Sequence, residues 1–165
     1  MFRFWYGPVV GMRVSGAWIG YAACLFLEFG TPDHETLRDK IGRPNRKVTK
    51  GEWSLSTMEY GPRWRVSLQG RSLVKSDSVD RQRNWALSRL VGRRLHSLEV
   101  DEQTFATRLR FSQGLSLETE RIPPSLWRPS FQPHWLITNR NTRRDIKWPH
   151  ITVLRGRVRP WKTGF

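Results

Sequence analysis

The pattern of hydrophobic and polar residues along the chain predicts a mostly β protein. Apolar and polar residues alternate with period two at 64–68, 107–111 and 115–117, which is the pattern of strands with one buried face. The sequence Ser-Gln-Gly at 112–114 separates the last two runs and predicts a hairpin turn. The apolar run 16–29 is shorter than the roughly 20 residues that a membrane span needs, and we interpret it as strand.

Helical periodicity is confined to a small part of the chain. We expect one helix at 78–90, linking the two halves, and a short second helix at 32–40 that begins with acidic residues. The segment 38–50 is predicted to be an exposed loop, because it holds Gly42 and Pro44 among six basic residues, and 121–133, with four prolines, an extended connector. The apolar residues of the first helix are Val79, Trp85, Ala86, Leu87 and Leu90.

Several landmarks occur twice, separated by 81 to 84 residues. Residues 9–14 match 90–95, and the Leu-x-Phe step at 27–29 matches 109–111. Further along, Trp53 precedes Trp135 by 82 residues and Trp64 precedes Trp148 by 84, which suggests that these tryptophans belong to the core. The repetition predicts two diverged β units, 1–80 and 81–165, sharing one compact domain. We expect them to pack about a pseudo-twofold axis as a sandwich or barrel-like pair, with little α structure.

The motifs Gly-Glu-Trp-Ser-Leu at 51–55 and Pro-Arg-Trp-Arg at 62–65 follow a Phe-Gly step at 29–30. This order resembles that of a group of small bacterial proteins of unknown function, and the resemblance covers mainly residues 9–80. It implies a bacterial or phage-related source. It implies no particular activity, so no functional residue is carried over, and the basic C-terminal segment of this chain departs from the pattern.

Positive charge dominates the composition and increases toward the C-terminus. The 165 residues include 29 lysines and arginines against 14 acids, a net charge of +15. Residues 121–165 contain ten basic residues and a single acid, Asp145. A charge distribution of this kind attracts polyanions such as nucleic acid, acidic proteins or anionic lipid.

Basic residues are interleaved with aromatic ones, as in Arg63-Trp64-Arg65 and around Trp148 and Trp161. Arginine binds phosphate through two hydrogen bonds, and exposed aromatics stack on unpaired bases. Alternation would place Arg155, Arg157 and Arg159 on one face of an extended strand. The residues that we single out as nucleic-acid contacts are Trp127, Arg128, Arg143, Arg144, Lys147, Arg155, Arg157, Arg159, Trp161 and Lys162, with Arg43, Arg46 and Lys47 in the first half.

The sequence offers no recognisable catalytic or metal-binding constellation. The four histidines lie far apart, and only His34 has carboxylate neighbours, whereas metal ligands are usually paired closely in sequence. The carboxylates at 99–102 and 118–120 could suggest a two-metal nuclease, but we interpret them as a solvated strand edge and turn. The glycine motifs of nucleotide-binding proteins and serine hydrolases do not occur. We therefore expect no catalytic residue, metal or cofactor.

Taken together, these features predict a non-enzymatic nucleic-acid-binding subunit. It would contact the backbone of RNA or single-stranded DNA within a bacterial or phage ribonucleoprotein or defence assembly, beside other protein subunits and away from membranes. Two alternatives stay open: a protein-binding immunity or inhibitor module, and a small basic nuclease. The single cysteine, Cys24, cannot form an internal disulfide and suggests a buried side chain in a reducing, cytoplasmic environment.

Overall fold

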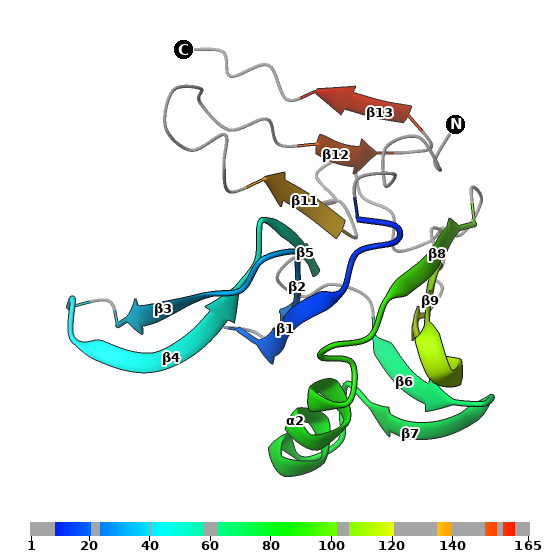
Figure 1. The fold of residues 1–165 in the computed structure, drawn as a ribbon, viewed down its shortest axis with the longest axis horizontal. Coiled ribbons are helices and arrows are strands. Elements are labelled where there is room, and N and C mark those ends of the chain that lie inside the picture. The colour runs from blue at the N-terminus through cyan, green and yellow to red at the C-terminus, as the bar shows by residue number, and fades with distance from the viewer. Residues whose placement is uncertain are drawn as a thin grey trace.

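The computed structural model describes residues 9–20, 24–39, 41–57, 63–101, 106–120, 135–139, 151–154 and 157–160. Within these ranges the protein is mostly β, with three antiparallel sheets and one α-helix, and none of the sheets closes into a barrel (Figure 1). The class predicted from the hydrophobic pattern is therefore confirmed.

Two larger sheets enclose one hydrophobic core. The first has six strands, in the spatial order β1 (Val14–Ile19), β2 (Leu25–Phe29), β5 (Trp53–Thr57), β11 (Trp135–Asn139), β12 (Ile151–Leu154) and β13 (Arg157–Pro160). The second has five, in the order β7 (Arg71–Lys75), β6 (Trp64–Leu68), β10 (Leu115–Thr119), β9 (Thr107–Phe111) and β8 (Leu95–Val100). Helix α2 (Asp80–Ser88) joins β7 to β8.

Each of the two larger sheets combines strands from both halves of the chain. Strands β6 and β7 belong to the first 80 residues, yet β6 pairs with β10 of the second half. In return, β11 of the second half pairs with β5 of the first. The core cluster accordingly contains side chains from both halves, so the two predicted units share one core.

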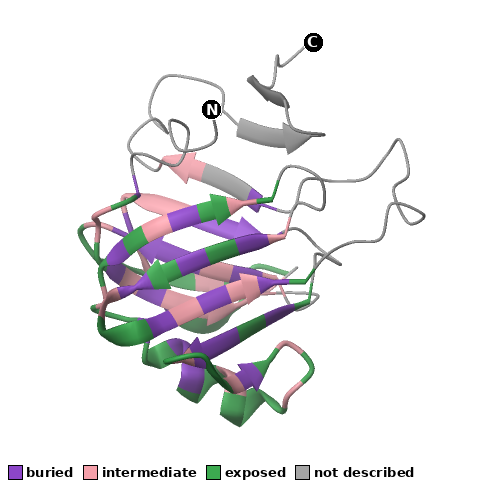
Figure 2. Cartoon of the chain, turned by 90° about the vertical axis from the view of Figure 1, so that its right-hand side faces the viewer, coloured by how far each residue is buried: buried purple, intermediate pink, exposed green. Residues whose placement is uncertain are grey.

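The core follows the alternation of the strands. Figure 2 shows buried and exposed positions alternating along the strands of the five-stranded sheet. Leu109 and Phe111 of β9 point inward with Leu117 of β10 beside them. Two buried threonines accept hydrogen bonds from the first N–H of a neighbouring strand. The Oγ1 atom of Thr57 accepts the Leu25 N–H at 2.9 Å, and that of Thr119 accepts the Thr107 N–H at 2.8 Å.

Two turns that contain glycine, one before β1 and one before β8, are joined by backbone hydrogen bonds. Gly11 and Gly92 both have positive φ, +90° and +80°, a conformation that glycine adopts without strain. Their neighbours Arg13 and Arg94 face each other in an antiparallel bridge. The bonds run in both directions: Gly11 N–H to Leu95 O (2.7 Å), Gly92 N–H to Val14 O (2.7 Å), Val14 N–H to Arg93 O (2.8 Å) and Leu95 N–H to Met12 O (2.9 Å).

The short helix predicted at 32–40 and the loop predicted at 38–50 are both wrong. Strands β3 (Asp33–Arg38) and β4 (Pro44–Lys50) form a two-stranded hairpin, here called the arm, which projects from the two larger sheets (Figure 1). Asp39 organises its turn by accepting hydrogen bonds from the Ile41 and Arg43 N–H groups at 3.0 and 2.9 Å. Cross-strand pairing thus decides the structure of a segment whose local composition favours a loop.

The predicted helix is confirmed, and its apolar residues differ in burial. Ala86, Leu87 and Leu90 are buried, whereas Val79 and Trp85 are 65% and 50% exposed. Cys24 is half-buried rather than buried. No helix among the described residues is long and apolar enough to cross a membrane.

The predicted match of Trp53 with Trp135 is also wrong. Trp53 is half-buried opposite Phe29, whereas Trp135 is buried opposite Thr57. Trp64 is buried opposite Thr119. The arm lies between β2 and β5 in the chain, whereas β9 and β10 are joined by only the turn Ser112–Gly114. Trp148 lies outside the described residues.

Phe111→Ala should lower the free energy of unfolding by about 3–5 kcal/mol, because it removes a 3% exposed aromatic ring from the core. Urea denaturation measures the loss. Val91→Ala serves as a control, since Val91 is 43% exposed and its truncation should change stability by less than about 0.5 kcal/mol. Equal stabilities of the parent and Phe111→Ala would contradict the described core.

Candidate nucleic-acid interface

Most of the predicted C-terminal contacts lie outside the described residues. These are Trp127, Arg128, Arg143, Arg144, Lys147, Arg155, Trp161 and Lys162. Arg157 and Arg159 lie on β13, which is the outermost strand of the six-stranded sheet. β12 ends at Leu154 and pairs antiparallel with β13, which begins at Arg157. The predicted strand face shared by Arg155, Arg157 and Arg159 stays a prediction, because Arg155 lies outside the described residues.

The predicted contacts of the first half lie on the arm, where two of them have structural partners. The Nε atom of Arg43 lies 3.1 Å from Asp39 Oδ2, and hydrogen bonds from the Arg43 backbone and side chain lower the pKa of Asp39. Arg46 lies with its Cζ atom 5.1 Å from the centre of the Trp18 ring and also donates a hydrogen bond to Ile19 O. Lys47 is exposed.

The base of the arm packs onto the outer face of the six-stranded sheet. A Cβ atom on Gly16 would lie 2.6 Å from Thr49 O, so glycine is needed where β4 crosses β1. Next to this crossing, the Trp18 and Phe26 rings stack at 4.0 Å, and Lys50 Nζ lies 4.5 Å from the centre of the Trp18 ring. Arg46 and Lys50 therefore help to attach the arm to the sheet, and they are less available to bind a ligand.

A second basic surface, which the sequence interpretation did not single out, covers α2 and the loop after it. It consists of Arg81, Trp85, Arg89 and Arg93 and is called the α2 surface below. Arg81, Trp85 and Arg89 are exposed at intervals of four residues, which places them on one side of the helix. The Cζ atom of Arg89 lies 5.2 Å from the centre of the Trp85 ring, and Arg93 Nε donates a hydrogen bond to Arg89 O at 3.2 Å.

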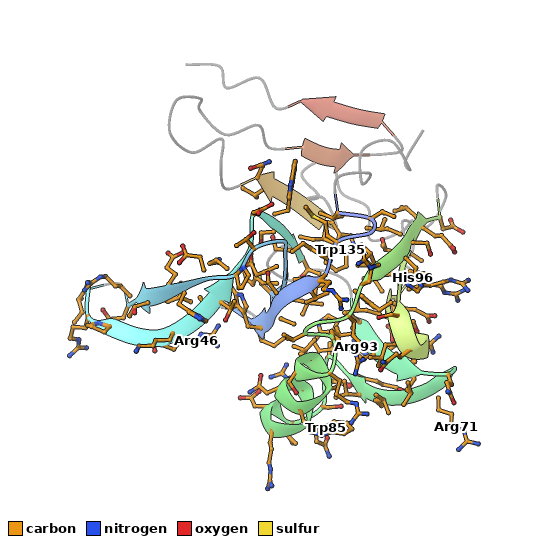
Figure 3. The ribbon with its side chains drawn as sticks, in the orientation of Figure 1. Arg46, Arg71, Trp85, Arg93, His96 and Trp135 are labelled. Carbon is orange, nitrogen blue, oxygen red and sulfur yellow. The ribbon has the colours of Figure 1, made fainter. Side chains whose placement is uncertain are left out.

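The α2 surface continues onto the paired glycine turns. Arg13 Nη1 donates a hydrogen bond to Gly92 O at 2.8 Å, and Arg94 donates one to Gly11 O. Figure 3 shows Trp85 pointing away from the body of the protein and Arg93 on the loop above α2. The signal that could have revealed this region is the segment 81–98, which contains five arginines and no acidic residue.

The outer face of the five-stranded sheet has a different electrostatic character. Charged residues from all five strands stand opposite one another in a single row, in the order Lys75, Arg65, Glu118, Arg108 and Glu99. Glu118 forms ion pairs with two arginines: its Oε2 atom lies 2.5 Å from Arg65 Nη2, and its Oε1 atom lies 2.8 Å from Arg108 Nε. The row borders a cavity of about 680 Å³ that is also lined by Asp101 and Glu120. The mixture of signs makes this face a poor binding site for a polyanion.

Among the described residues, no group of three His, Cys, Asp or Glu side chains lies close enough together to hold a metal ion. The expectation of no metal and no cofactor stays a prediction. No family model, curated protein or solved structure matches the chain. Its function is therefore inferred from its own residues and their geometry.

Glu118→Gln should destabilise the protein at neutral pH and have a smaller effect in acid. Burial would raise the pKa of Glu118, but hydrogen bonds and charges from Arg65 and Arg108 outweigh it and lower the pKa. A carboxylate with a lowered pKa stabilises the folded state fully above the pKa of the unfolded chain, about 4.3, and this stabilisation is lost as the pH falls through the folded-state pKa. Urea unfolding of parent and variant at pH 7 and pH 3 measures the difference.

Glu99→Gln is the matched control for this change. Glu99 is half exposed and lies 3.5 Å from Arg110, so its substitution should cost less at pH 7. A penalty for Glu118→Gln that stays constant from pH 7 to pH 3 would contradict the ion-pair interpretation.

Proposed function

We propose that this protein is a non-enzymatic nucleic-acid-binding subunit that contacts the phosphate backbone, in a bacterial or phage ribonucleoprotein or defence assembly. The observation that carries the proposal is the α2 surface, in which arginines surround an exposed tryptophan within a segment that has no acidic residue. Charge alone would suit any polyanion. The aromatic ring among the cations favours nucleic acid, because bases offer flat faces to stack on.

The arginines of the α2 surface have donor groups available for phosphate. None of the ion pairs among the described residues involves Arg81, Arg89 or Arg93, whereas Arg83 of the same helix pairs with Asp80 and donates to Ser76 O. A guanidinium has five N–H donors, and one hydrogen bond to a backbone carbonyl leaves most of them for an anion. Phosphate contacts of this kind would position the nucleic acid without reading its sequence.

We also propose that the two halves are diverged copies related by a pseudo-twofold axis. The reciprocal bonds between the glycine turns support this, because adding 81 to Gly11, Val14 and Met12 gives Gly92, Leu95 and Arg93, the residues of the return bonds. The two strand pairs that join the halves support it as well. Trp135 stands opposite Thr57, as Trp64 stands opposite Thr119, and both threonines cap a strand N–H.

If the two halves are equivalent, Thr57→Val and Thr119→Val should destabilise the protein to a similar extent. Each leaves one buried backbone N–H without its acceptor, at a cost of about 1–3 kcal/mol. Urea denaturation of both variants gives the comparison. A difference between them larger than about 1 kcal/mol would argue against equivalent positions.

The nucleic-acid function is tested with a triple variant of the α2 surface, Arg81→Gln, Arg89→Gln and Arg93→Gln. It should bind RNA and DNA oligomers more weakly regardless of sequence. The magnitude of the slope of log affinity against log salt should fall by about 0.7 per lost phosphate contact on single strands, or 0.9 on duplex. Fluorescence anisotropy at several salt concentrations measures both quantities.

A charge-matched triple on the arm, Arg38→Gln, Arg43→Gln and Lys47→Gln, is the control and should have the smaller effect. Equal effects of the two triples would rule out the α2 surface as the main contact. A parent that does not bind at physiological salt would favour the protein-binding alternative, and cleavage of the oligomer would favour a nuclease.

A further inference from the structure

Among the described residues, Trp85 is the one Phe, Tyr or Trp side chain that is exposed rather than buried or half-buried. The helix has a buried side, formed by Ala86 and Leu87, but Trp85 is on the opposite side, where half of its surface meets solvent. Core packing therefore does not account for a tryptophan at this position. An exposed aromatic ring of this size usually marks a contact with a partner.

The arginines around Trp85 define the chemistry of that partner. Arg89 lies one helical turn after Trp85 with its guanidinium over the ring, which limits the orientations that the ring can adopt. Arg81 lies one turn before Trp85, and the helical rise between Arg81 and Arg89 is about 12 Å. Arg93 continues the line through its bond to Arg89 O. The ring is thus flanked by cations in both directions along the helix axis.

We infer that the α2 surface binds unpaired nucleotides, with one base stacked on Trp85 and the neighbouring phosphates bound by Arg81, Arg89 and Arg93. This inference rests on the proposed nucleic-acid function and makes it specific to single strands. Stacking on a protein side chain needs a base whose face is open, and the bases of an intact duplex are stacked on each other. Phosphate contacts alone would not distinguish the two forms.

The test compares two oligomers of equal charge, a 12-residue oligothymidine and an abasic deoxyribose-phosphate strand of the same length. The parent should bind the oligothymidine more tightly than the abasic strand. Trp85→Ala should weaken oligothymidine binding by about 5- to 150-fold, the range for one stacked base. It should leave binding of the abasic strand unchanged within about twofold, since the phosphate contacts remain.

Two further variants separate stacking from general loss of the surface. Trp85→Phe should restore part of the affinity for oligothymidine, because phenylalanine retains a ring that can stack. Arg89→Gln should weaken binding of both oligomers by a similar factor, because it removes a phosphate contact. The melting temperatures of the variants, measured in parallel, should match that of the parent, since these side chains are exposed. An oligouridine that depends on Trp85 in the same way also supports the inference.

The outcomes distinguish the inference from the function on which it rests. If the parent binds both oligomers equally and Trp85→Ala changes neither affinity, stacking is overturned while phosphate binding stands. Equal binding of the parent to a 12-base-pair duplex and to oligothymidine would also overturn it. If neither oligomer binds at physiological salt, the proposed function itself fails.

Discussion

The hydrogen-bonded pairs β5–β11 and β6–β10 are the connections on which the rest of the structure depends. Each pair joins a strand from one half of the chain to a strand from the other, so each larger sheet is complete only when both halves contribute. The buried side chains that pack between the two sheets likewise come from both halves. Neither half alone contributes more than three adjacent strands to either sheet, so the complete sheets and the core between them need both halves.

This arrangement also decides how positive charge is distributed over the surface. On the five-stranded sheet, strand pairing brings Glu118 between Arg65 and Arg108, so that acids offset the arginines. On the arm, Arg43 and Arg46 are engaged with Asp39, Trp18 and Ile19. Arg89 and Arg93, which follow helix α2, have no such acidic neighbours in sequence. The packing of α2 against the rest of the protein through Ala86 and Leu87 leaves them at the surface. Clustering of uncompensated cations, more than net charge, creates a binding surface for a polyanion.

Strands with clear alternation were predictable because burial of one face leaves a local trace in the sequence. Leu109 and Phe111 are buried as their period-two pattern indicates, and the Ser-Gln-Gly turn lies where the pattern breaks. The arm was missed because β3 and β4 are mostly exposed and have little apolar periodicity, and their pairing joins residues up to 17 positions apart, such as Asp33 and Lys50. The exposure of Trp85 could not be predicted for a related reason. An apolar residue in a short helix does not show which side of the helix meets the core, and only packing decides it.

By itself, the sequence determined that the chain forms a mostly β structure with a helix near residues 78–90, that positive charge greatly exceeds negative charge, and that short segments of the two halves are alike. These are properties of local pattern and composition. Only the tertiary structure decided that strands of the two halves share sheets, that Trp64 and Trp135 are buried while Trp53 is half-buried, and that Trp85 stands exposed among arginines. The physical reason is that strand partners and the environment of a side chain depend on residues distant in sequence, whose contacts no local pattern encodes.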